Sequence, residues 1–125
     1  MFYIIEINDI INCKLFKFIG LSVNKSRIRN YCGLYMEKIS KANNLDSIGA
    51  VIYSISDNMI KVSLRKERLI DNIKDDYNLA YISSIYNGGG HKTAASFIIH
   101  RSKFNKIAKS INDVEKIKIP KYNVL

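Results

Sequence analysis

The chain has 125 residues, of which 47% are hydrophobic and 25% are charged, as is typical of one globular domain. Its two cysteines, Cys13 and Cys32, are too few for a disulfide framework or a paired-cysteine zinc site. No apolar run approaches the length of a membrane span, and no secretory leader is recognisable. We therefore expect a cytoplasmic protein with no membrane partner.

The formal net charge of +9 is unevenly distributed along the chain. Residues 1–60 carry 7 basic and 5 acidic side chains, whereas residues 61–125 carry 13 basic and 6 acidic ones. A positive excess in one half favours a polyanionic ligand such as nucleic acid. The same excess also fits a general bias toward lysine, because 15 of the 20 basic residues are Lys.

The first third of the chain predicts two strands followed by a helix. Residues 2–7 and 13–23 are rich in β-branched and aromatic residues, which favour strands. Asn24 is placed to cap a helix that ends at Asn43 and Asn44. The apolar residues of this helix recur at spacings of three and four: Ile28, Tyr31, Cys32, Tyr35, Met36 and Ile39. We interpret this stripe as a packing face.

A hairpin is predicted next. Residues 48–55 are almost continuously apolar, which indicates a strand covered on both faces, and Asp57-Asn58 is a two-residue turn signal. The following strand alternates between an apolar face and a polar face, formed respectively by Ile60, Val62 and Leu64, and by Lys61, Ser63 and Arg65. Ser63 and Arg65 thus lie about 7 Å apart on one side. A solvated outer face would show the same alternation.

Residues 67–76 are polar and predict a loop, in which Asp75 or Asp76 caps a helix that runs to Tyr86. That helix leads into three consecutive glycines: Gly88, Gly89 and Gly90. Glycine loses more backbone entropy than any other residue, so a triplet in an ordered domain needs a physical reason. We expect a glycine loop that something approaches closely.

After the glycines, Thr93-Ala94-Ala95 is predicted to begin a short helical turn. Free backbone N–H groups beside a helix N-terminus form a concave anion site, and His91 and Lys92 stand at its lip. A helix C-cap followed by a flexible turn would explain the same glycines.

The remaining residues predict a strand and a last helix. The strand covers residues 97–100, and Ser102 is placed to cap the helix. The buried stripe of this helix is Phe104, Ile107, Ala108 and Ile111. Residues 116–119 predict an edge strand or a tail. We therefore expect residues 1–125 to form a single compact α/β domain, with a mixed sheet of about five strands and helices packed on it.

Two motifs carry a family resemblance. Gly-Gly-Gly-His, followed by two residues, Ala-Ala, a small residue and Phe, resembles the signature of the DHH-associated domain, type 1. This is the C-terminal substrate-binding domain of DHH-family phosphoesterases, such as RecJ-type exonucleases, nano-RNases, oligoribonucleases and nucleotide phosphatases. Residues 61–65 are similar to the family's Val-Ser-Leu-Arg strand, and the resemblance is clearest over residues 48–100. The family usually has Gly at Ser96 and a small hydroxyl residue at Lys66.

The resemblance implies a phosphate-binding site in which Arg65 and His91 converge on one ligand. A guanidinium group offers a planar fork suited to phosphate oxygens. The site residues implied by the resemblance are Ser63, Arg65, Gly88, Gly89, Gly90, His91 and Lys92. The implied ligand is a short single-stranded nucleic acid or a nucleoside phosphate. Lys61 is a further candidate for a backbone-phosphate contact.

Catalytic residues and a metal site are not expected in this chain. DHH phosphoesterases hydrolyse their substrates with metal ions held by Asp and His residues of a separate N-terminal domain. This chain has only two histidines, His91 and His100, and no Asp-His-His triplet. The resemblance therefore implies a binding domain that is inactive alone, with Mn²⁺ or Mg²⁺ held only by a partner DHH catalytic domain in cis or in trans.

Two other functions fit the sequence. One is an RNA-binding module like the related C-terminal domain of alanyl-tRNA synthetases, which lacks the histidine found here at His91. The other is a degenerate domain that kept the fold as an interaction surface and lost ligand binding. The intact Gly-Gly-Gly-His motif and Ser63-Leu64-Arg65 argue against the degenerate domain.

Overall fold

The computed structural model describes residues 1–24, 29–67 and 77–120, and over these residues it has the predicted α/β class. The sheet contains seven strands rather than the expected five or so. The strands are β1 (Phe2–Asp9), β2 (Lys14–Ser22), β3 (Gly49–Ser54), β4 (Met59–Arg65), β5 (Gly89–His91), β6 (Ala94–His100) and β7 (Ala108–Ser110). The helices are α1 (Arg29–Ala42), α2 (Leu79–Ser84) and α3 (Arg101–Ile107), with a short 3₁₀ turn at Val114–Lys116.

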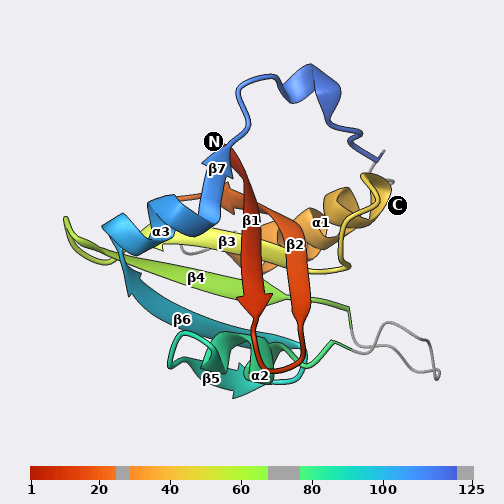
Figure 1. The fold of residues 1–125 in the computed structure, drawn as a ribbon. Coiled ribbons are helices and arrows are strands. Elements are labelled where there is room, and N and C mark those ends of the chain that lie inside the picture. The colour runs from red at the N-terminus through yellow and green to blue at the C-terminus, as the bar shows by residue number, and fades with distance from the viewer. Residues whose placement is uncertain (25–28, 68–76, 121–125) are drawn as a thin grey trace.

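The strands follow the order β5-β6-β4-β3-β2-β1-β7 across the sheet. The neighbours β2 and β3 are parallel, and α1 makes the crossover between them, whereas all other neighbouring pairs are antiparallel. Figure 1 shows β1 and β2 crossing β3, β4 and β6 at a steep angle, so the sheet is strongly twisted. Among the described helices, none is long and apolar enough to cross a lipid bilayer.

Helices pack on both faces of the sheet, and α1 covers only part of its face. The larger core lies between the sheet, α2 and α3, and it includes Phe18, Val62, Leu64, Leu79 and Phe97. On the opposite face, the α1 residues Met36 and Ile39 pack against Ile19 of β2. The predicted helical stripe is therefore a packing face at Met36 and Ile39, whereas Tyr31, at 73% exposed, lies outside the core, and Ile28 lies outside the described residues.

A polar network ties the β1–β2 hairpin to α2. The Asp9 carboxylate accepts hydrogen bonds from the Asn12 side-chain amide at 2.8 Å and from the Tyr81 hydroxyl at 3.0 Å. These hydrogen bonds, that from the Asn12 side chain first, lower the pKa of Asp9. The hairpin thereby has a fixed position beside the helix that leads to the glycines.

The chain after the glycines forms a hairpin and not the predicted helical turn. Gly89–His91 is strand β5, residues 92 and 93 form the turn, and Ala94–His100 is strand β6. Residues Ala94 and Ala95 lie inside the ladder with β5 and β4, where cross-strand pairing outweighs their local preference for helix.

The C-terminal part also differs from expectation. The last helix ends at Ile107, and Ala108–Ser110 pairs with β1 as strand β7. Its cap is His100, whose Nδ1 accepts the Ser102 N–H at 3.1 Å, and not Ser102 itself. Residues 116–119 were expected to form an edge strand or a tail; Lys116 ends the 3₁₀ turn and residues 117–119 belong to no strand or helix.

The start of α2 is capped by Asn78, whose side chain accepts the Tyr81 N–H at 3.2 Å. The predicted capping residues Asp75 and Asp76 lie outside the described residues. The hairpin predicted at Asp57-Asn58 is present between β3 and β4, with the Ile55 N–H donating to the Met59 carbonyl oxygen at 2.9 Å. Its loop is longer than the two residues expected.

Candidate phosphate-binding site

The predicted alternation of β4 is confirmed. Ile60, Val62 and Leu64 are buried in the larger core, which leaves Lys61, Ser63 and Arg65 on the opposite face, the one that carries α1. Ser63 is only 8% exposed. The polar face of β4 is therefore half enclosed, and it does not have the open exposure of a solvated outer strand.

Helix α1 covers part of this face through two glycines. A Cβ atom on Gly33 would lie 2.9 Å from Arg65 Cβ, and a Cβ atom on Gly49 would collide with the Gly33 carbonyl oxygen. The helix therefore sits directly on β3 and against the aliphatic stem of Arg65. It packs on β2 and β3 and reaches β4, whereas β6 and β5 lie beyond it.

Arg65 and His91 belong to one row of residues that runs across the sheet. Arg65 of β4 pairs with Ala94 of β6, and Ala94 pairs with His91 of β5. Directly paired residues point to the same face, and two strand spacings separate Arg65 and His91 by about 10 Å between Cα atoms. The methyl group of Ala94 leaves space above the sheet between the two longer side chains.

A second row lies two residues further along the strands. It consists of Ser63 on β4, Ser96 on β6 and Gly89 on β5. All three residues are small, so they form a low floor beside the Arg65–His91 row. We call this surface, made of the two rows, the β4–β6–β5 trough.

Each glycine of the triplet has a separate role. A Cβ atom on Gly88 would collide with the Ser96 carbonyl oxygen, so Gly88 allows the close approach of β6. Gly90 has a φ of +141°, which disfavours any residue with a side chain. A Cβ atom on Gly89 would meet no heavy atom within 4 Å, so Gly89 leaves open space at the surface of the trough.

The hairpin that carries the glycines is fixed at both ends. At its start, Asn87 adopts a left-handed φ of +61° and the Gly88 N–H donates to the Ser83 carbonyl oxygen at 2.9 Å, which ends α2. At its turn, the Leu79 N–H donates to the Lys92 carbonyl oxygen at 2.9 Å. His91 is thus held on a rigid scaffold although its side chain is exposed.

The pairing register of β4, β6 and β5 determines which glycine N–H points away from the sheet. The Lys66 N–H donates to the Thr93 carbonyl oxygen, so hydrogen-bonded and non-hydrogen-bonded pairs alternate from that point. Gly89 and His91 then exchange hydrogen bonds with β6, and the backbone N–H of Gly90 points to the open edge of the sheet. Residues 93–95 form the end of the turn and the start of β6 and not the predicted helix N-terminus, so the open backbone N–H at this position belongs to the sheet edge.

A guanidinium group and a carboxylate both lie near the C-terminal end of β4, the first on Arg65 and the second on Glu37. Its Nη1 donates to the Leu64 carbonyl oxygen at 2.8 Å. The buried carboxylate of Glu37 on α1 accepts the Glu67 N–H with both oxygens, at 2.9 and 3.0 Å, just beyond the end of β4. Burial is the main cause that raises the pKa of Glu37.

Lys66, where the family usually has a small hydroxyl residue, lies away from the trough. Alternation directs its side chain to the core side of the sheet, where it is 5% exposed and its Nζ lies 5.8 Å from the Tyr77 ring centroid. Ser96 replaces the usual glycine on the trough floor, where its side chain is half-buried.

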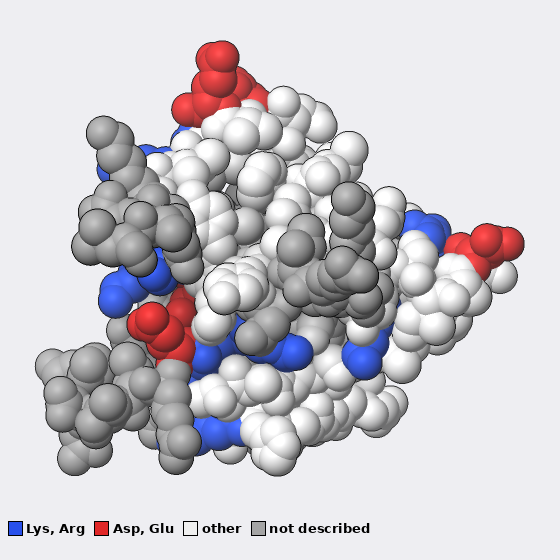
Figure 2. Space-filling view, turned by 180° about the vertical axis from the view of Figure 1, so that it is seen from behind, with Lys and Arg blue, Asp and Glu red and all other residues white. Residues whose placement is uncertain are grey.

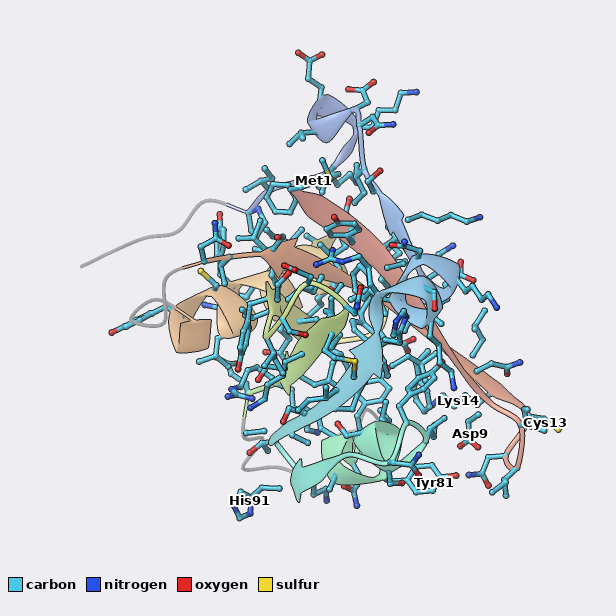
Figure 3. All side chains as sticks on the ribbon, turned by 90° about the vertical axis from the view of Figure 1, so that its left-hand side faces the viewer. Met1, Asp9, Cys13, Lys14, Tyr81 and His91 are labelled. Atoms are coloured by element: carbon cyan, nitrogen blue, oxygen red, sulfur yellow. The ribbon has the colours of Figure 1, made fainter. Side chains whose placement is uncertain are left out.

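The position of His91 can be followed in the figures. Figure 3 shows His91 on the same side as α1, whereas Asp9, Lys14 and Tyr81 lie on the other side. Figure 2 looks onto the α1 side, and there blue Lys and Arg atoms run in a broken band across the lower half of the face. This face therefore carries basic side chains, with red acidic groups among them.

No family model matches the chain, and no curated protein matches it. The resemblance thus rests on the motif residues alone. Of the predicted site residues, the register brings Ser63, Arg65, Gly89 and His91 to a single face, whereas Gly90 pairs with the core residue Ala95 and Lys92 lies in the turn. Within the described part of the chain, no three His, Cys, Asp or Glu side chains are grouped so that they could hold a metal ion. Sequence reasoning missed Ala94 and Gly33, because their roles depend on cross-strand register and helix packing.

Proposed function

We propose that this chain is the substrate-binding domain of a DHH-type phosphoesterase, and that it binds a terminal phosphate of a nucleotide or short single-stranded nucleic acid in the β4–β6–β5 trough. The proposal is supported above all by the row that contains Arg65, Ala94 and His91. Two side chains with N–H donors stand on one face, on either side of a small residue, beside the open N–H of Gly90.

Each group in the trough has a specific task in this proposal. Arg65 binds two phosphate oxygens through its planar fork. His91 donates from a ring nitrogen on the other side, and the Gly90 N–H binds a remaining oxygen at the sheet edge. Ser63 contributes a neutral hydroxyl from the second row. Lys92, exposed at the hairpin turn, attracts the nucleic acid backbone electrostatically.

The hydrolytic step belongs to a partner in this proposal. A DHH catalytic domain, in cis or in trans, supplies the metal ions, Mn²⁺ or Mg²⁺, and this chain positions the substrate. Basic side chains that neutralise the phosphates of the ligand release the counterions associated with those phosphates, so affinity is expected to fall as salt rises.

The direct test is titration of a 5′-phosphorylated short oligonucleotide and of its unphosphorylated form into the 125-residue chain at several salt concentrations. We expect tighter binding of the phosphorylated form, and Arg65→Ala should remove that difference. Lys109→Ala, on β7 far from the trough in strand order, is the control. Equal affinity for both forms in the parent protein would exclude a terminal-phosphate site.

A further inference from the structure

A third row of residues continues the trough along the strands. Ile98 of β6 pairs with Lys61 of β4, and Lys61 pairs with Tyr53 of β3. These residues are two positions beyond Ser63 and Ser96, so their side chains point to the same face. Four residues along a strand span about 13 Å, which is the distance from the Arg65 row to this third row.

The third row has a different chemistry from the first. Ile98 is 49% exposed, which makes it one of the exposed large hydrophobic residues of the protein. Beside it, Lys61 carries a positive charge, with its Nζ 5.9 Å from the Tyr53 ring centroid. An apolar surface and a cation therefore lie side by side at this end of the trough, and the floor between the two ends has only small residues.

We infer that Lys61 and Ile98 form a second nucleotide subsite, in which Ile98 packs against a base and Lys61 binds the phosphate that joins the first and second nucleotides. This inference rests on the proposed function, since the first phosphate must be held in the Arg65–His91 row. A mononucleotide held there covers only the low middle row. A second nucleotide extends the ligand to Ile98 and Lys61.

The distance between the Arg65–His91 row and the Lys61–Ile98 row should make affinity depend on ligand length. Only a ligand with at least two nucleotides can occupy both ends at once, so affinity should increase with length from one nucleotide to two. Burial of apolar surface between Ile98 and a base should raise affinity about fivefold. The added phosphate contact should also make dinucleotide binding steeper in salt than mononucleotide binding.

The experiment compares a 5′-phosphorylated mononucleotide with a 5′-phosphorylated dinucleotide on the full chain. Ile98→Ser and Lys61→Met should lower dinucleotide affinity to the mononucleotide level and leave mononucleotide affinity unchanged. Methionine keeps the apolar stem of lysine while it removes the charge. The matched controls are Ile55→Ser, a 51% exposed isoleucine in the β3–β4 loop, and Lys106→Met on α3.

The outcomes separate the two proposals. If the parent binds both ligands with equal affinity, or if Ile98→Ser and Lys61→Met weaken both ligands equally, the second subsite is wrong while the phosphate site stands. If the parent binds neither ligand, the proposed function fails and the second subsite fails with it. Arg65→Ala should weaken both ligands, which identifies the first phosphate site independently of length.

Discussion

Gly33 of α1 lies directly against Arg65 of β4, so close that a methyl group on Gly33 would be 2.5 Å from Arg65 Cγ. The helix thereby forms one wall of the trough and limits the positions that the arginine stem can take. The direction of the guanidinium group depends on a residue distant in sequence that contributes no side chain.

This relationship predicts that Gly33→Ala will weaken phosphate binding more than it changes stability. Alanine gains about 1 kcal/mol over glycine in a helix interior, which offsets part of the steric cost against Arg65. The displaced arginine should lower affinity severalfold. Binding isotherms beside thermal melts measure both effects, and Gly33→Ala in an Arg65→Ala background is the control, because no arginine is then left to displace.

The shared row predicts non-additive effects for Arg65→Ala and His91→Ala. Each single change should cost on the order of 1.5–3 kcal/mol of binding, the range for hydrogen bonds to charged groups. If both residues hold one phosphate, the double variant should lose less than the sum of the two. Fold stability should barely change in His91→Ala, because His91 is exposed. A strictly additive cycle would indicate that the two residues act on separate ligand groups.

Substitution by alanine at two adjacent glycines of the triplet is expected to have opposite effects on stability. Gly88→Ala would force a methyl group against the backbone of Ser96 and Phe97, with an expected cost of about 1–3 kcal/mol in the free energy of unfolding. Gly89→Ala meets no heavy atom and should keep or slightly raise stability.

Gly89→Val tests the open surface of the trough. The larger side chain should reduce ligand affinity in a protein that still folds. Chemical denaturation gives the unfolding free energies of the glycine variants. A Gly89→Val protein that binds like the parent would show that the ligand does not approach this point.

Glu37 predicts a specific pH dependence of stability. Its pKa in the folded protein is raised above the ordinary value of 4.5, mainly because the carboxyl group is buried. The folded state therefore favours the protonated form, and the stability associated with this group is present at pH below 4.5 and is lost as pH rises through the folded pKa. Glu37→Gln should remove this loss, so its melting temperature relative to the parent should increase across that window.

The control for this change is Glu6→Gln, which removes a carboxylate from the partly exposed ion pair with Lys17. Glutamine at position 37 retains an oxygen that can accept the Glu67 N–H. If the difference between parent and Glu37→Gln were constant with pH, the raised pKa would not contribute to stability.

Strands with clear local patterns could be predicted from sequence. The β-branched and aromatic residues of β1 and the alternation of β4 are local signals, and the continuous apolar run of β3 reflects its burial on both faces. The alternation of β4 correctly predicts two faces. The core face carries Ile60, Val62 and Leu64, and the opposite face carries Lys61, Ser63 and Arg65.

The two short strands could not be predicted in this way. Strand β5 is three residues long and contains two glycines, so it has no local preference for a strand and depends on its pairing with β6. In the same way, Ile107, Ala108 and Ile111 fit a helical spacing, but Ala108 pairs with Ile5 of β1. Neither local composition nor periodicity contains information on these partners.

The pairing of β7 with β1 has a consequence for how the protein is made. Strand β1 ends at Asp9, yet one of its edges is covered only when Ala108–Ser110 has been made, and the Ile111 N–H then donates to the Phe2 carbonyl oxygen. During synthesis, β1 and β2 can pair early while the outer edge of β1 keeps unpaired backbone groups until residue 110 has left the ribosome. An uncovered strand edge invites pairing with other chains, so nascent chains that stop before residue 108 should aggregate more readily than chains that include β7.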